Sequence, residues 1–208
     1  NYTGTFGDMG CFSFNGNKII STGGGGLITG NDVHKLEHIK FLINQAKDET
    51  REYYHPEIGF NYRMTNIGAA LGLAQIEKLE KFLAKKRRFN EIYKEELGEI
   101  DFIRFQKEYE GSECSFWLSC ILVEENINLL ELQKKLKERK IPTRRIFMPA
   151  TEMSPYQHCK QDELRNSHRI YNRGLCLPSS ILNSVDDIYY VCKTIKKLVI
   201  NGLLKVSL

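Results

Sequence analysis

The fold is decided by residues 12–26, FSFNGNKIISTGGGG, where a single lysine stands between an aromatic run and four consecutive glycines. Residues 12–14 and 26–29 contain aromatic or β-branched side chains bounded by Gly and Asn, a pattern typical of short strands. We therefore expect a hairpin-like frame whose loop carries Lys18.

Lys18 has two interpretations from the residues alone. A phosphate-binding P-loop is excluded, because it needs its glycines before the lysine and a helix after it, whereas here the glycines follow and lead into a predicted strand. An amine in an apolar or cationic setting loses part of its proton affinity and can attack a carbonyl group. The other interpretation is a surface lysine beside a glycine turn.

The composition is that of an ordinary globular protein. The chain has 208 residues, of which 41% are hydrophobic, and a formal net charge of +4, so it can bury a sizeable core. Basic and acidic residues are interleaved, so we expect no nucleic-acid partner and interpret the basic run at residues 85–88 as the solvated face of a helix. No apolar run reaches the ~18 residues of a membrane span, so no membrane partner is expected.

The cysteines and histidines indicate no metal centre. The six cysteines form no CxxC pair, and His34 and His38, four residues apart, have no cysteine nearby and are interpreted as a surface pair. Reduced thiols in a cytoplasmic protein fit this pattern best.

We expect two domains with a boundary near residue 90. After a first helix over residues 31–43, a long helix begins at Thr65 or Asn66; its first half is apolar nearly all round and should be buried, and its polar second half leads into the next domain. From there the pattern predicts a compact α/β domain with a capping box at Ser184 and Asp187. Its strands are expected at residues 102–105, 116–123 and 143–147, and its helices at 129–139, 163–173 and 186–200.

Four segments resemble the DegT/DnrJ/StrS-type sugar-nucleotide aminotransferases, which use pyridoxal phosphate (PLP). Residues 8–26, DMGCFSFNGNKIISTGGGG, look like the cofactor-lysine segment of that family, and residues 55–79, HPEIGFNYRMTNIGAALGLAQIEKL, are similar to its GxNYRM segment and the helix after it. Residues 142–145, PTRR, and 174–179, GLCLPS, resemble its small-domain strand and G-x-x-LPS turn.

The resemblance implies an α/β chain that is the C-terminal part of a fold-type I PLP-dependent transferase. Residues 1–90 would belong to the PLP-binding large domain, and residues 91–208 would form the small C-terminal domain. The family's large domain begins before residue 1, and its earlier part carries the aspartate that pairs with the pyridinium nitrogen and the helix N-terminus that binds the phosphate. We therefore expect the chain to be incomplete and inactive by itself.

The resemblance also implies roles for four residues. Lys18 would be the catalytic Schiff-base lysine, and Ser13 would hydrogen-bond the cofactor phosphate. Asn61, with Arg63 as a further contributor, would reach the cofactor of the adjacent subunit, so that a homodimer shares its active site. From the residues alone, Ser13 could instead be a solvent-facing strand hydroxyl, Asn61 a turn or cap residue, and Arg63 a surface arginine.

The reaction implied is the transfer of an amino group, usually from glutamate, to a keto carbon of a nucleotide-linked deoxysugar, with PLP as the electron sink. Lysine rather than histidine at position 18 favours amino transfer over sugar dehydration. The sequence NGNKII at residues 15–20 and the arginines at 144 and 145 most resemble those of the family branch that acts on UDP-linked 4-keto-6-deoxy-N-acetylhexosamines in surface-polysaccharide synthesis. An alternative from another class is a non-catalytic binding or regulatory module that keeps the aminotransferase fold.

Overall fold

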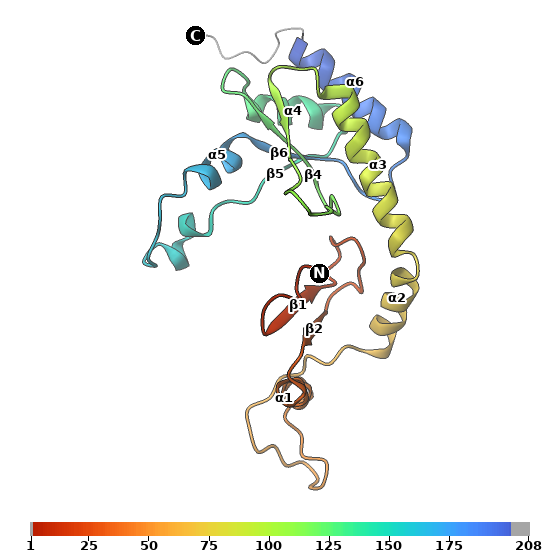
Figure 1. Ribbon diagram of the computed structural model, residues 1–208, viewed down its shortest axis with the longest axis vertical. Coiled ribbons are helices and arrows are strands. Elements are labelled where there is room, and N and C mark those ends of the chain that lie inside the picture. Colours follow the sequence, from red (N-terminus) through yellow and green to blue (C-terminus); the bar gives the residue numbers. More distant parts are fainter. Residues whose placement is uncertain (1, 201–208) are drawn as a thin grey trace. The chain divides into compact units, whose positions relative to one another are not determined.

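The computed structural model describes residues 2–200, which form two compact units, one ending at Lys81 and the other beginning at Phe82 (Figure 1). The division falls inside helix α3 (Leu79–Leu97), earlier than the expected boundary near residue 90. The reason is packing, because Phe89 and Ile92 of this helix are fully buried in the core of the second unit.

The first unit is built on the expected hairpin. Strand β1 (Met9–Ser13) pairs antiparallel with β2 (Gly26–Gly30), with Ser13 opposite Gly26. Gly26 approaches its partner strand so closely that a Cβ there would lie 2.5 Å from the carbonyl oxygen of Phe12. A side chain at this position would push the strands apart, which explains the last glycine of the run.

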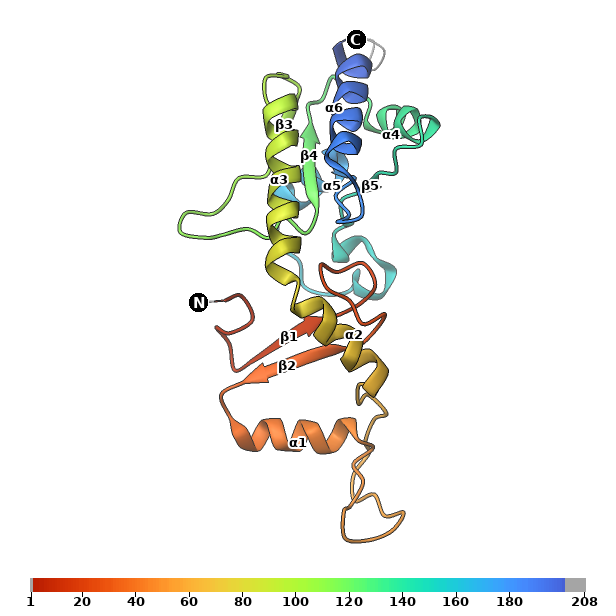
Figure 2. The ribbon, with the colours of Figure 1, turned by 90° about the vertical axis from the view of Figure 1, so that its right-hand side faces the viewer.

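Helix α1 (Val33–Ile43) follows the hairpin and lies beside β2 (Figure 2). Its N-cap is Asp32, one residue later than the expected start, and the Asp32 side chain accepts a hydrogen bond from the Lys35 N–H at 3.1 Å. This bond satisfies one of the amide groups that a helix start leaves without an internal partner.

The last carbonyl groups of α1 are satisfied by residues 60–63. The Leu42 carbonyl oxygen accepts from the Phe60 N–H at 2.7 Å, and that of Ile43 accepts from the N–H groups of Tyr62 and Arg63 at 3.0 and 3.1 Å. Carbonyl groups at a helix end otherwise lack intrahelical partners. The backbone around Asn61 is thereby fixed to the end of α1.

The expected long helix is in fact two helices. Helix α2 (Asn66–Ile76) is capped as predicted by Thr65, whose side-chain oxygen accepts from the Gly68 N–H at 3.2 Å. A tight turn then separates it from α3, with the Lys78 N–H bonded to the Gln75 carbonyl at 3.0 Å. An i to i−3 bond of this kind replaces the α-helical pattern where a helix ends.

The expected burial of α2 is not found among the described residues. No residue of the helix is buried, and Ile67 and Leu73 are 85% and 61% exposed. The physical reason is that the first unit supplies a neighbour for one face of α2 only, the face that carries Gly68, Gly72 and Gln75.

The second unit contains a four-stranded antiparallel sheet with the order β3-β4-β6-β5. Its strands are β3 (Ile103–Phe105), β4 (Ser119–Val123), β5 (Arg144–Arg145) and β6 (Gly174–Leu177). The GLCL of residues 174–177, expected as part of a turn, is a strand in the interior of this sheet with every residue buried. Leu175 and Leu177 belong to the hydrophobic core, which favours a strand over an exposed turn.

The helices of this unit are α3, α4 (Leu129–Glu138), α5 (Arg165–Arg173) and α6 (Val185–Ile200), with short 3-10 turns at Ala150–Glu152 and Ser154–Tyr156. The predicted capping box is confirmed, because the Ser184 hydroxyl oxygen accepts from the Asp187 N–H at 3.1 Å while the Asp187 carboxylate accepts from the Ser184 N–H at 2.7 Å. The core draws on α3, α4, α6 and three strands, with Tyr93, Leu97, Ile121, Leu132, Leu175, Ile188 and Ile195 among its fully buried side chains. None of the helices within residues 2–200 has the length and apolar character needed to cross a membrane.

The basic run at residues 85–88 is not simply a solvated helix face. Lys86 is only 6% exposed and its ammonium donates to the Trp117 carbonyl at 2.7 Å. Arg87 contacts Glu113 at 2.7 Å, and Arg88 contacts both Glu91 and Glu95. Burial lowers the pKa of Lys86 to about 8, because the charged form loses its hydration.

Replacing Lys86 by methionine is expected to change how stability depends on pH. The unfolded lysine keeps its proton up to its ordinary pKa of about 10.4, so between about pH 8 and that value the unfolded chain binds more protons and the wild type gains stability as pH rises. Lys86→Met lacks this gain. Its free energy of unfolding relative to wild type should therefore fall by on the order of 1–3 kcal/mol between pH 7 and pH 10.

Urea unfolding followed through Trp117, the one tryptophan of the chain, measures this difference in the second unit. Lys81→Met, at an exposed position of the same helix, is the matched control and should run parallel to wild type. Parallel curves for Lys86→Met and wild type would contradict the lowered pKa.

Candidate functional site

Lys18 lies in a loop that hydrogen bonds close on both sides. The Phe14 N–H donates to the Gly25 carbonyl at 3.0 Å, while the Phe14 carbonyl accepts from the Thr22 N–H at 3.0 Å and the Ser21 hydroxyl at 3.1 Å. Inside this closure the Lys18 N–H donates to the Asn15 carbonyl at 3.0 Å, and the lysine is half-buried. The loop therefore presents Lys18 from a defined turn.

Helix α2 supports the same loop through a contact that sequence reasoning missed. The side-chain oxygen of Gln75 accepts from the Ser21 N–H at 2.9 Å. A Cβ at Gly72 would lie 2.9 Å from a methyl carbon of Thr22, so glycine allows the helix to approach the loop. The signal for this contact was present in the sequence, since Gly68, Gly72 and Gln75 recur at helical spacing on one face.

Ser13 is the last residue of β1 and sits next to the start of the loop. Its hydroxyl oxygen accepts from the Asn15 N–H at 3.3 Å, and the residue is exposed. The hydroxyl proton remains able to donate, because the bond to Asn15 uses a lone pair only. Ser13 and Lys18 thus belong to one hydrogen-bonded hairpin.

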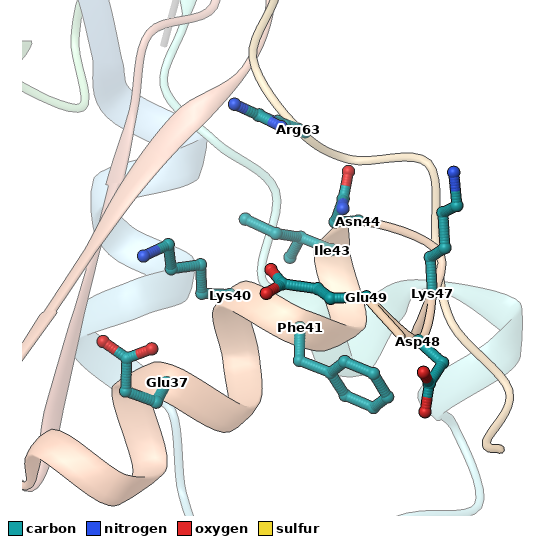
Figure 3. Close-up of a pocket in the computed structure, with 9 residues that line it drawn as sticks. All are labelled: Glu37, Lys40, Phe41, Ile43, Asn44, Lys47, Asp48, Glu49 and Arg63. Atoms are coloured by element: carbon teal, nitrogen blue, oxygen red, sulfur yellow. The ribbon is translucent and has the colours of Figure 1, made fainter. Parts of the chain in front are cut away.

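Asn61 and Arg63 lie on the segment that closes α1. Asn61 forms an isolated antiparallel bridge with Asn44, and both Asn61 and Arg63 are exposed. Arg63 lines a pocket of about 500 Å³ whose polar side chains include Glu37 and Lys40 (Figure 3). The remaining lining residues are Phe41, Ile43, Asn44, Lys47, Asp48 and Glu49.

The four predicted site residues therefore form two pairs in the first unit. One pair, Ser13 and Lys18, lies on the hairpin, and the other, Asn61 and Arg63, lies at the end of α1. Directly after Arg63 in the sequence, the side chain of Met64 approaches the Lys18 loop, since its terminal carbon is 3.2 Å from the position of a Cβ on Gly25. Gly25 has φ +98°, a conformation that residues other than glycine rarely adopt, which fixes its identity in this turn.

A mixed α/β chain with a lysine held in a glycine-rich hairpin fits the PLP-dependent transferase class that the sequence resemblance implies. The chain belongs to the DegT/DnrJ/EryC1/StrS aminotransferase family, whose sequence model matches residues 1–196. This confirms the family resemblance inferred from the sequence and makes PLP the cofactor of the family to which the chain belongs.

Two relatives and one solved structure show how far the similarity extends. The chain is 36% identical to a GDP-perosamine synthase of Escherichia coli O157:H7 over 94% of its length and 38% identical to one of Caulobacter vibrioides over 85%. It shares the fold of the aminotransferase TlmJ from Streptoalloteichus hindustanus, with a TM-score of 0.87 and 24% identity over 98% of the chain. The chain covers 53%, 48% and 54% of these three proteins respectively, so it spans about half their length.

The expected fold, part of a fold-type I PLP-dependent transferase, is confirmed by this structural match. The hairpin also fits the cofactor chemically. Gly23 and Gly24 have nothing within 4 Å of the position of a Cβ, so the backbone there is open to a bulky planar group. A primary amine on Lys18 and a donating hydroxyl on Ser13 supply the kinds of group that hold an aldehyde and a phosphate.

Removal of the Gln75 side chain should loosen the Lys18 loop without unfolding the unit. Gln75→Ala takes away the acceptor of the Ser21 N–H, a bond between neutral groups worth about 1 kcal/mol. We expect amide hydrogen exchange at Ser21 and its loop neighbours to accelerate roughly threefold to tenfold.

Hydrogen exchange with mass spectrometry on the loop peptide provides the measurement. Glu80→Ala, at an exposed position of the next helix, serves as the control and should leave the loop unchanged. Equal loop exchange in Gln75→Ala and wild type would show that the bond does not hold the loop.

Proposed function

We propose that the chain serves a PLP-dependent sugar aminotransferase, which moves an amino group from glutamate to a keto carbon of a nucleotide-linked deoxysugar. One observation carries the proposal. In a chain of this family, Lys18 is presented from a loop closed by hydrogen bonds to Phe14 and supported by α2. A nucleophilic lysine needs a defined position to act repeatedly on the same carbonyl carbon.

Each of the four residues has a proposed role that its surroundings support. Lys18 would bind the cofactor through its amine and later move the proton at the substrate carbon. PLP would supply the electron sink. Ser13 would donate its hydroxyl proton to a phosphate oxygen, since its lone pair already accepts from the Asn15 N–H.

Asn61 and Arg63 would bind the phosphate from the other subunit of a homodimer. Their side chains are exposed while their backbone is fixed to the end of α1, so they can reach a second chain from a rigid base. An arginine suits this role because its planar guanidinium gives paired hydrogen bonds to phosphate oxygens. We therefore propose a cofactor contact for Arg63 in preference to the alternative of a general surface arginine.

The relatives differ in the nucleotide that carries the sugar. GDP-perosamine synthases match at 35–38% identity, a dTDP-4-amino-4,6-dideoxy-D-glucose transaminase at 31% and a UDP-4-amino-4,6-dideoxy-N-acetyl-β-L-altrosamine transaminase at 25%. The dTDP-linked and UDP-linked sugars of the last two enzymes are both named as 4-amino-4,6-dideoxy sugars. We therefore propose a nucleotide-linked 4-keto-6-deoxyhexose as substrate, made in the cytoplasm for a surface polysaccharide, with the UDP-linked N-acetylated sugar of the sequence analysis as one candidate.

Trapping with borohydride tests the role of Lys18. The protein is mixed with PLP, reduced and digested, and the modified peptide is mapped by mass spectrometry. We expect a cofactor-sized adduct on Lys18 that is lost in Lys18→Ala and kept in Lys78→Ala, an exposed lysine of the same unit. Adducts spread evenly over the exposed lysines would contradict the assignment and favour a binding module that keeps the fold.

The substrate is tested by incubation with glutamate and 4-keto-6-deoxyhexoses linked to GDP, dTDP or UDP. Because the chain spans about half its relatives' length, a second sample adds the residues that those relatives have beyond the matched part. We expect glutamate-dependent formation of a 4-amino sugar with one nucleotide, lost in Lys18→Ala. Amination that proceeds equally in Lys18→Ala would refute the proposed mechanism, and no amination of any of the three sugars would refute the proposed substrate class.

A further inference from the structure

A pair of thiols to which no role has been assigned above lies on the sheet of the second unit. Cys120 of β4 and Cys176 of β6 are directly opposite each other in the antiparallel register, and their sulfur atoms are 3.6 Å apart. Opposite residues of antiparallel strands have Cα atoms about 4.5–5.5 Å apart, within the range of about 4.4–6.8 Å that a disulfide spans. The backbone therefore already has the spacing that a bond between the two sulfurs requires.

The pair lies on the side of the sheet that faces away from the main core. Along β4 the residues alternate between Ser119, Ile121 and Val123, which are buried, and Cys120 and Leu122, which are half-buried. Successive side chains of a strand point to opposite faces. Cys120 and Cys176 therefore lie on the face of the sheet opposite the core helices, and a separate cavity adjoins this face.

This cavity gives small molecules access to the sulfur atoms. It has a volume of about 540 Å³ and is lined by Cys120 and Cys176 together with apolar side chains, among them Trp117, Phe147 and Ile170. Cys176 is only 4% exposed and Cys120 is half-buried, and both residues line this cavity.

The electrostatic setting makes one of the two thiols reactive. The Cys120 S–H donates to Cys176, and Arg144, directly opposite Cys176 on β5, adds positive charge. Both effects lower the pKa of Cys176, to about 7, while the Cys120 thiol keeps its proton and has a raised pKa. A thiolate beside a protonated partner is the pairing that thiol oxidation uses.

We propose that Cys120 and Cys176 form a reversible oxidation site for peroxides, independent of the proposed transferase activity. The Cys176 thiolate attacks one peroxide oxygen and the O–O bond breaks, which gives a sulfenic acid at Cys176 and, with one proton, the first water. The Cys120 thiol then attacks the Cys176 sulfur and releases the second water. Two thiols lose two electrons and two protons, one hydrogen peroxide becomes two water molecules, and one disulfide forms.

The third cysteine of the cavity, Cys114, is not part of the strand pairing that sets Cys120 opposite Cys176. The Cys114 sulfur accepts from the Phe116 N–H at 3.4 Å, and Cys114 stands outside the strands rather than in register with either thiol. Of the three thiols, Cys120 and Cys176 are the two that the strand register sets opposite each other. The pairing is therefore expected to be specific.

The test uses the folded wild-type protein and hydrogen peroxide. After exposure, free thiols are blocked with iodoacetamide and the digest is searched for linked peptides. We expect a single linked species between the Cys120 and Cys176 peptides, with the loss of two hydrogens. Dithiothreitol should reverse the link. A sample that is unfolded first and oxidised afterwards should not form it. In Cys120→Ser, dimedone should label Cys176 instead, because the sulfenic acid has lost its partner.

Three further variants, one test and two controls, sharpen the result. The double variant of the exposed cysteines, Cys11→Ser with Cys159→Ser, should form the linked peptide at the wild-type rate. Arg144→Met should slow its formation by roughly threefold or more, because less Cys176 is then a thiolate at neutral pH, whereas Arg139→Met should not. A linked peptide that contains Cys114, or oxidation confined to Cys11 and Cys159 while the pair stays reduced, would overturn the proposal.

Discussion

The first unit depends on the double hydrogen bond that the Phe14 carbonyl accepts from the Ser21 hydroxyl and the Thr22 N–H. These bonds return the chain to the strand frame after Lys18, so the loop closes on itself rather than extending into solvent. Without them, β1 and β2 would still pair, but the lysine would sit on an open excursion. A loop closed in this way loses its conformational entropy once, during folding, rather than each time a substrate binds.

Helix α2 extends this constraint beyond the hairpin. The Gln75 side chain binds the loop backbone, and Gly72 lets the helix approach Thr22 closely. Only this face of α2 is used within the described residues, while Ile67, Leu71, Leu73 and Ile76 remain exposed. Exposed apolar side chains gathered on one element often mark a surface that contacts another protein element.

The sequence predicted the hairpin, the Thr65 cap, the capping box at Ser184 and most of the helices, because each depends on residues close together in the chain. Hydrogen-bonding side chains at helix starts and glycines at turns carry their physical reason locally. The break between α2 and α3 and the strand at 174–177 were missed, because they depend on packing against distant residues. The family resemblance supplied the proposed site residues, but the support that Gln75 gives to the Lys18 loop required the fold, since Ser21 and Gln75 are 54 residues apart.

The basic run at residues 85–88 shows why charge pattern alone was misleading. Interleaved charges predicted a solvated helix face, yet the Lys86 ammonium binds the Trp117 carbonyl and the Arg87 guanidinium binds the Cys114 carbonyl at 3.3 Å. These two bonds fix the segment that precedes β4 to α3, and the same segment forms one wall of the cavity beside the Cys120 and Cys176 thiols. Burying the Lys86 ammonium costs free energy, because the charge loses its hydration. We infer that the hydrogen bond to the Trp117 carbonyl serves to hold this wall of the cavity in place. Lys86 and Arg87 therefore hold one wall of the cavity beside the two thiols, although their helix, α3, packs on the opposite face of the sheet.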